Sequence, residues 1–227
     1  MRRPPHTEQT GRSGRDELKV DRSVWYCQVM VRARPAPSVA FDADTSVRDR
    51  IMATACRLFY DEGIQAVGIQ RIIDEAGIAK ASLYAHFASK DDLVAAYLAE
   101  KGRSTQTCMG THLDNPRLSA KAKILKLFDM VVAAAEEPGF RGCAIQNASL
   151  EVADPAHPIR AAAREQRAWM HDVFTALARE VAGSAAAGER LAGALMVLHD
   201  GAVATSVIDR DPAAARHARW AAEKMLA

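Results

Sequence analysis

The stretch GIAKASLYAHFASKDDL, residues 77–93, decides the fold. Its centre predicts a short helix, and at 100° per residue Leu83 and Phe87 fall one turn apart on the inner face of that helix. The smallest side chains of the segment lie almost opposite: Ala81, Ser82 and Ala85. A helix with so thin an outer face can bring its backbone close to the base edges in the major groove of DNA. The stretch therefore predicts a recognition helix.

The flanks of this helix favour contact with a polyanion. Tyr84 and His86 lie on either side of the thin face, from which polar groups can reach phosphates. Residues 76–90 contain no acidic side chain, whereas Lys80 and Lys90 are cationic. Lys90 also stands at the start of the next helix, where free backbone amides form a phosphate site. The alternative for Tyr84 is that it packs in a core and has no partner outside the protein.

Two helices upstream complete the pattern. Ser46 and Asp49 form a capping box, and the apolar residues that follow recur at helical spacing: Ile51, Ala55, Leu58 and Phe59. Gly63 ends that helix. A second short helix, IQRIIDEA at residues 69–76, ends at Gly77, and the quoted stretch begins a third. Two short helices separated by a glycine are typical of a helix-turn-helix.

The segment from Val47 to Leu98 closely resembles the DNA-binding domain of the TetR family of one-component transcriptional regulators. The string Leu-Tyr-x-His-Phe-x-Ser-Lys-Asp-Asp-Leu, in register with both upstream helices, makes the resemblance specific. The resemblance implies that nine residues of the helix-turn-helix contact DNA: Lys80, Ala81, Ser82, Tyr84, Ala85, His86, Lys90, Gln70 and Arg71. Gly68 and Ala79 stand where hydroxyl residues usually cap the second and third helices, so the family's phosphate contact from that hydroxyl is not expected at Ala79.

Composition, charge and cysteine spacing limit which other classes of protein this chain can belong to. The 227 residues carry 30 Lys and Arg against 28 Asp and Glu, and a net charge of +2 does not by itself indicate a nucleic-acid binder, so that expectation depends on local charge. The four cysteines lie far apart without a Cys-x-x-Cys pair, which argues against a zinc knuckle or a disulfide framework and favours a reducing cytosol. No uninterrupted apolar run approaches the roughly 18 residues of a membrane span. We expect a cytoplasmic protein with no cofactor and no membrane segment.

The expected organisation is all-α. Residues 1–45 are rich in Arg, Pro, Ser and Asp, and we expect a disordered extension there, with Met30 as an alternative first residue. Residues 46–101 form an N-terminal three-helix helix-turn-helix DNA-binding domain. Residues 102–227 form a larger helical domain, for which the resemblance implies effector binding and dimerisation.

Turn signals divide the second domain into helices, which we expect near residues 118–136, 144–152, up to about 181, 187–207 and 212–226. The resemblance implies that the last two helices pair across a twofold axis in a homodimer. An apolar seam with small neighbours supports such packing: Leu191, Gly193, Ala194, Leu195, Leu198, Gly201 and Ala202. Burial of this seam inside one protomer is the alternative.

The stretch FRGCAIQNASLEVADPAHPI, residues 140–159, is the most distinctive part of the second domain. Asn147 and Glu151 share one stripe of a helix, where a few polar groups can orient a mainly apolar effector. A solvated polar face is the alternative. The expected effector pocket also includes Trp169, Phe128 and His199, although Trp169 and Phe128 are more typical of a core than of a ligand contact.

Two other site types are not expected. A metal set of Cys143, Glu151, His157 and His199 lacks any diagnostic ligand spacing. An enzyme that uses Cys143 as nucleophile and His157 as base lacks a third orienting group and a glycine-rich oxyanion loop.

The sequence therefore predicts a ligand-responsive regulator, most simply a repressor, that binds a pseudopalindromic operator as a homodimer and leaves it when a small molecule binds. The fourth helix, which joins the two domains near Gly102, is the expected lever. A DNA-binding protein without an effector is the alternative.

Overall fold

The computed structural model describes residue 41 and residues 44–227, and within this part every regular element is a helix. The helices are α2 (Val47–Glu62), α3 (Ile69–Ala76), α4 (Lys80–His86), α5 (Lys90–Leu113), α6 (Ala120–Glu136), α7 (Ala144–Leu150), α8 (Pro158–Val181), α9 (Ala185–Asp209) and α10 (Ala213–Met225). The predicted all-α fold is confirmed. The predicted disorder of residues 1–45 lies, apart from residues 41, 44 and 45, outside the described residues.

Serine side chains begin the helices that the sequence marks with capping boxes. The Ser46 hydroxyl accepts a hydrogen bond from the Asp49 N–H at 3.1 Å, and Ser89 does the same for Asp92 at 3.1 Å. At the start of α3 and α4, Gly68 and Ala79 make no side-chain cap, as their residue types dictate. Gly77 then turns the chain from α3 into α4 with φ 61°, a left-handed conformation that favours glycine.

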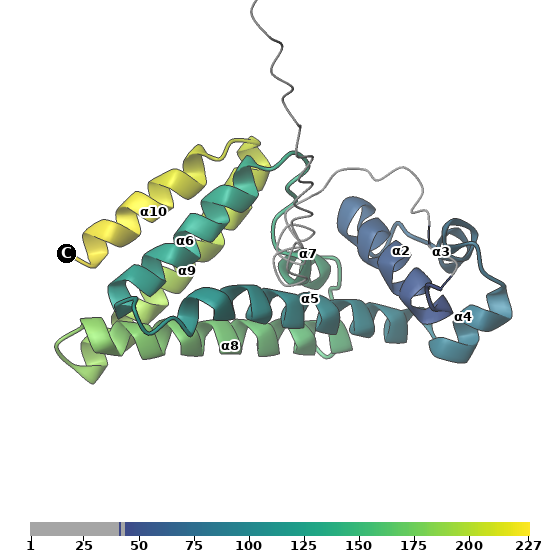
Figure 1. Ribbon diagram of the computed structural model, residues 1–227, viewed down its shortest axis with the longest axis horizontal. Helices are drawn as coiled ribbons and strands as arrows, with labels where there is room; N and C mark the ends of the chain where they lie inside the picture. The colour runs from purple at the N-terminus through teal and green to yellow at the C-terminus, as the bar shows by residue number, and fades with distance from the viewer. Residues whose placement is uncertain (1–40, 42–43) are drawn as a thin grey trace, which may run out of the picture.

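The helices gather around two cores (Figure 1). The first core lies among α2, α3, α4 and the N-terminal half of α5, and the buried side of α7 and Ile159 of α8 also enter it. The second core lies among α6, α8, α9 and α10. Helices α5 and α8 pack side by side and connect the two cores. The predicted boundary between residues 101 and 102 falls within α5, which continues as one helix across it.

Among the described residues one helix, α9, is long and apolar enough to cross a membrane by length and composition alone. The helix packs against α6, α8 and α10, and Asp200 in its middle pairs with Arg167 of α8. Only 33% of its most apolar window is buried in the protomer. An apolar face of α9 is therefore left uncovered within one chain.

Candidate nucleic-acid interface and interior cavity

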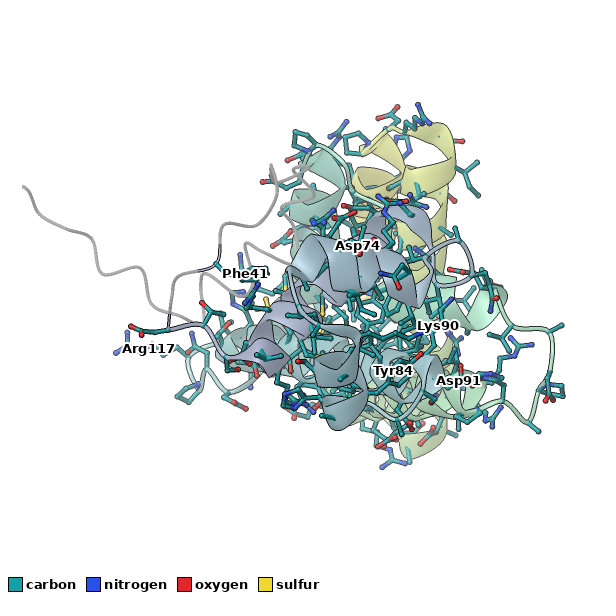
Figure 2. All side chains as sticks on the ribbon, turned by 90° about the vertical axis from the view of Figure 1, so that its right-hand side faces the viewer. Phe41, Asp74, Tyr84, Lys90, Asp91 and Arg117 are labelled. Atoms are coloured by element: carbon teal, nitrogen blue, oxygen red, sulfur yellow. The ribbon has the colours of Figure 1, made fainter. Side chains whose placement is uncertain are left out.

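Helix α4 presents the thin face that its sequence predicts. Leu83 is fully buried and Phe87 nearly so, whereas Ala81 and Ala85 on the other side are exposed. Tyr84 is 45% exposed, so its ring is not a core residue, and the alternative of a packed Tyr84 does not fit this position. Figure 2 looks onto the end of the molecule built from α2, α3 and α4, and both Tyr84 and Lys90 lie on it. This surface has the shape that an insertion into a major groove needs.

Basic residues border the thin face. Lys80 opens α4 and His86 closes it, and both side chains are exposed. Lys90 is the first residue of α5, next to backbone amides that carry the positive end of the helix dipole. Asp91 and Asp92 follow in the same turn, so the phosphate site at Lys90 depends on the lysine and the free amides rather than on the net charge of the turn.

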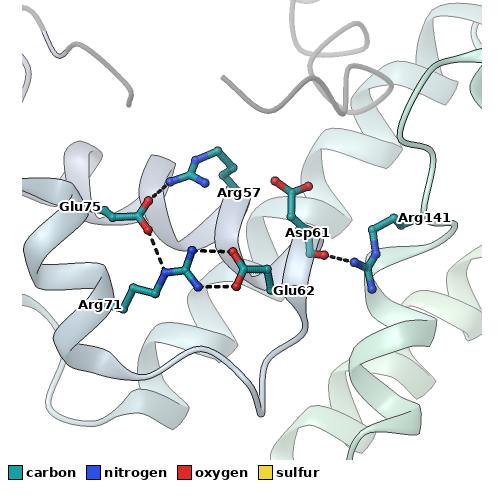
Figure 3. Close-up of polar contacts among 6 residues, drawn as sticks. All are labelled: Arg57, Asp61, Glu62, Arg71, Glu75 and Arg141. Atoms are coloured by element: carbon teal, nitrogen blue, oxygen red, sulfur yellow. Dashed lines mark hydrogen bonds and ion pairs between the residues drawn. The ribbon is translucent and has the colours of Figure 1, made fainter. Parts of the chain in front are cut away.

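The other two predicted DNA contacts, Gln70 and Arg71, already bond within the domain. The Arg71 guanidinium pairs with Glu62 at the end of α2 and with Glu75 one turn further along α3, and Arg57 of α2 also pairs with Glu75 (Figure 3). Hydrogen bonds from Arg71 lower the pKa of Glu75.

Gln70 donates to Asp74 at 2.8 Å. The Arg71–Glu62 and Arg57–Glu75 pairs link α3 to α2, whereas the Gln70–Asp74 bond lies within α3. Each of these exposed contacts is individually weak because solvent screens it. A DNA contact by Gln70 or Arg71 stays a prediction.

Sequence reasoning missed a positioning residue in α2. Arg50 donates hydrogen bonds to the carbonyl oxygens of Ala76 and Gly77, at 2.5 and 2.8 Å, where α3 ends. Those carbonyls have no partner inside the helix, and a cation there also suits the helix dipole. Arg50 thus fixes the turn that sets α4 relative to α2. The partners lie 26 and 27 residues away in the chain, so no local pattern marks the contact.

A cavity of about 470 Å³ lies between the two cores. Helices α5, α6, α7, α8 and α9 contribute to its wall, and Tyr60 from the end of α2 reaches it as well. Four methionines give much of its apolar surface: Met109, Met130, Met170 and Met196. Methionine side chains adapt to irregular shapes, so this wall suits a bulky apolar molecule.

One polar cluster interrupts the apolar wall. Asp200 of α9 accepts a hydrogen bond from Gln146 at 2.8 Å and pairs with Arg167. Burial by itself would raise the pKa of Asp200, but the neighbouring polar groups outweigh it and hold that pKa below its ordinary value. His199 lies beside it, with Nδ1 3.8 Å from the Asp200 carboxylate, which is too long for a hydrogen bond. The carboxylate is therefore ionised and satisfied, whereas the imidazole is not satisfied.

The predicted effector residues lie in three different places. His199 lines the cavity, and the ring of Phe128, fully buried in the second core, packs against it at a centroid distance of 6.0 Å. Trp169 is a partly buried neighbour of the second core. Asn147 and Glu151 line a separate, much smaller hollow beside α2. Their part in effector binding stays a prediction.

In this hollow beside α2, the side chains of Asn147 and Glu151 each make a hydrogen bond within the protein. The Asn147 amide donates to the Arg141 carbonyl at 2.7 Å. The Glu151 carboxylate accepts from the Gln65 N–H at 2.8 Å, in the loop between α2 and α3. Helical periodicity correctly predicts that these two side chains lie on one face of the helix. Only the packing of α7 shows that they face the first core.

Comparisons with known proteins place this geometry in a family. The model of the bacterial regulatory proteins of the tetR family matches residues 51–97. The crystal structure of SCO4454, a TetR-family transcriptional regulator from Streptomyces coelicolor, is 36% identical, covers 79% of this chain and 94% of its own, and superposes with a TM-score of 0.75. The chain belongs to the TetR family. It is a DNA-binding transcriptional regulator, and the family is not enzymatic.

Curated relatives match over a part of the chain. The transcriptional repressor KstR2 of Mycolicibacterium smegmatis is 43% identical over 49 residues, 22% of this chain. The transcriptional activator FasR of the same organism is 32% identical over 88 residues, 37% of this chain. The matched segments span only 24% and 40% of those two proteins. These short matches carry no conclusion about the effector.

Cys143 and His157 do not have the properties of a catalytic nucleophile and its base in this TetR-family chain. Burial raises the pKa of the Cys143 thiol, which keeps it protonated and a poor nucleophile. His157 accepts from the Ile159 N–H at 3.3 Å as the cap of α8, and its Nε2 lies 4.0 Å from Asp91. No cluster of three or more metal-ligating side chains occurs in the described residues.

A Lys90→Ala variant tests the phosphate site of the TetR-like surface. We expect affinity for specific and for random DNA to fall together, because phosphate contacts position a protein without reading sequence. The slope of log affinity against log salt should shrink by about 1. Fluorescence anisotropy across a salt series measures both quantities, with Lys123→Ala in α6 as the control. An unchanged slope and affinity would remove Lys90 from the interface.

Proposed function

We propose that this TetR-family regulator is a cytoplasmic, homodimeric repressor that binds a pseudopalindromic operator and releases it when a small molecule enters the cavity. The observation that carries the proposal is that Tyr60, at the end of α2 of the DNA-binding half, forms part of the wall of the 470 Å³ cavity. A molecule in that cavity therefore touches both halves of the chain. The two-part division, residues 46–101 for DNA and residues 102–227 for effector and partner, belongs to the same proposal.

The contacts around Tyr60 supply a route from the cavity to the DNA surface. The Tyr60 hydroxyl donates to the Gly142 carbonyl at 3.1 Å and accepts from the Arg141 N–H at 3.0 Å. The Arg141 guanidinium bonds to the Asp61 carbonyl (Figure 3). Burial raises the pKa of the Tyr60 hydroxyl, so it remains a neutral donor at physiological pH. Gly142 lines the cavity too, and its displacement would pull on the end of α2.

Helix α5 supplies a second route, the lever that the sequence suggested. Lys101, Thr105 and Met109 line the cavity from the same helix that begins at Lys90 beside the DNA surface. An effector shifts the equilibrium only if it binds one arrangement of these contacts better than the other. Release follows when the favoured arrangement no longer spaces two recognition helices about one turn of DNA apart.

The uncovered face of α9 supports the homodimer. Its exposed residues recur at intervals of three and four and are small or apolar: Ala194, Val197, Gly201, Ala204 and Ile208. Val197 is 68% and Ile208 79% exposed, and a Cβ added at Gly201 would meet nothing. Such a stripe matches the packing face of a helix bundle. Leu195 and Ala202 of the predicted seam are instead buried within the protomer, so for them the alternative is correct.

Aspartates at Val197 and Ile208 should separate the protomers. Burying two charges per chain at a twofold interface costs at least 2 kcal/mol, so we expect the dimer dissociation constant to rise about 30-fold or more. Sedimentation equilibrium measures it, and Leu150→Asp, at the exposed last residue of α7, is the control. A double variant as tightly dimeric as the parent would place the interface elsewhere.

The test of the whole proposal begins with selection of binding sites from random DNA. A pseudopalindromic motif, bound by two protomers per duplex in sedimentation velocity, supports the dimer. A transcriptional reporter under that motif then distinguishes a repressor, which lowers expression, from an activator such as FasR, which raises it. Screening small molecules for reversal in the same reporter tests effector release. A regulator that resists every compound would favour the alternative of a DNA-binding protein without an effector.

A further inference from the structure

We infer that the cavity takes a mainly apolar molecule that carries an uncharged hydroxyl group, a phenol or an alcohol, and that His199 is the residue that recognises this hydroxyl. The inference rests on the proposed function, because it names the chemistry of the effector that the cavity would bind. It also separates His199 from the other cavity residues, which contribute shape rather than hydrogen-bond selection.

The imidazole of His199 is buried without a partner. Its residue exposure is 9%, and neither Nδ1 nor Nε2 makes a hydrogen bond within the described part of the chain. The ring packs against the rings of both Phe128 and Phe174, at centroid distances of 6.0 and 5.9 Å, so aromatic contacts hold it in place. A buried polar group without a hydrogen bond is unfavourable, and natural proteins rarely retain one that serves no purpose. Because His199 lines the cavity, a bound molecule can supply the missing bond.

The charges near His199 determine which kind of polar group a ligand can place at the imidazole. The ionised Asp200 carboxylate lies 3.8 Å from Nδ1, so a carboxylate or phosphate bound at the imidazole would face a like charge at short range. A cationic group would meet Arg167, which already pairs with Asp200. A hydroxyl carries no charge and can both donate and accept, so it satisfies the imidazole in either tautomer.

The remainder of the wall is mainly apolar, and its other cationic side chains have partners in the protein. Lys101 lies over the rings of Tyr60 and Tyr97, Arg160 donates to the Ser149 carbonyl, and Arg164 donates to the Pro155 carbonyl. Around the polar cluster the cavity is bounded by the four methionines and by apolar residues of α6, α7 and α9 such as Leu127, Ile145 and Val203. The polar side chains that α7 contributes to the wall already have partners. The Ser149 hydroxyl donates to the Gln146 carbonyl at 2.8 Å, and the Gln146 amide donates to Asp200.

Three probes with the same bicyclic body test the inference by isothermal titration calorimetry on the full chain. They are 2-naphthol, 2-methoxynaphthalene and 2-naphthoate, which offer a neutral hydroxyl, an acceptor only, and an anion. We expect 2-naphthol to bind about fivefold tighter than either of the others, as one net hydrogen bond predicts. In His199→Phe, which keeps an aromatic ring packed against Phe128 and Phe174, the hydroxyl and the ether should bind within about twofold of each other. Ser149→Ala, the control, should keep the preference.

A measurement on the unaltered protein covers the case in which His199→Phe does not fold. In protein labelled with nitrogen-15 at histidine, 2-naphthol should shift the ring-nitrogen signals of His199 and 2-methoxynaphthalene should shift them less. Equal affinities of the three probes, tightest binding of 2-naphthoate, or unmoved His199 signals would overturn the inference while leaving the cavity as an effector site. Binding of none of the probes would count against the effector cavity itself, and with it the proposed function.

Discussion

An Ala85→Glu variant should lose operator binding completely while its melting temperature stays close to that of the parent protein. Ala85 lies on the exposed face of α4, opposite the buried Leu83, so a longer side chain there meets no part of the protein. On DNA the same side chain would occupy the space that the backbone of α4 needs, and its charge would face the phosphates. The loss is therefore an effect on binding and not on folding.

Circular-dichroism melting and fluorescence anisotropy on the selected operator measure the two effects of Ala85→Glu separately. Ala99→Glu is the matched control, because Ala99 is an exposed alanine on α5 away from α4. It should leave both melting and operator binding near the parent values. If Ala85→Glu unfolds the domain, or binds the operator as tightly as the parent, then the outer face of α4 is not the surface that enters the groove.

Leu83→Ala should instead lower the free energy of unfolding. Leu83 is fully buried in the first core, where it joins α4 to the helices that position it. Truncation of a buried leucine removes its transfer free energy and leaves a cavity, which together cost about 2–5 kcal/mol of the free energy of unfolding. This is a large share of the total for a domain of this size.

Denaturant titration followed by circular dichroism measures the destabilisation. Leu150→Ala is the matched control, since Leu150 is 81% exposed on α7 and should change the free energy of unfolding by less than about 0.5 kcal/mol. Operator affinity of the folded fraction of Leu83→Ala should remain near that of the parent, because the groove-facing side is intact. A Leu83→Ala change as mild as that of Leu150→Ala would contradict the assignment of Leu83 to the core.

The sequence by itself determined the DNA-binding half, because the signals there are local. Ser46 and Ser89 cap helices whose first turns lie within three residues of them, and Gly77 turns the chain one residue after α3. The inner and outer faces of α4 follow from the 3.6-residue period alone, and burial of Leu83 beside exposed Ala85 agrees with it. Side chains that act within one turn of helix are visible in a short window of sequence.

Features that depend on contacts between distant segments of the chain were determined only by the tertiary structure. Arg50 bonds to the end of α3, Tyr60 bonds to Gly142, and Glu151 bonds to the loop at Gln65, across 26, 82 and 86 residues of chain. Helical periodicity says that a residue faces inward but not which of two cores it faces. For that reason the sequence grouped α7 with the effector domain, whereas the packing places its buried side in the first core. The packing also places the imidazole of His199 in the wall of the cavity.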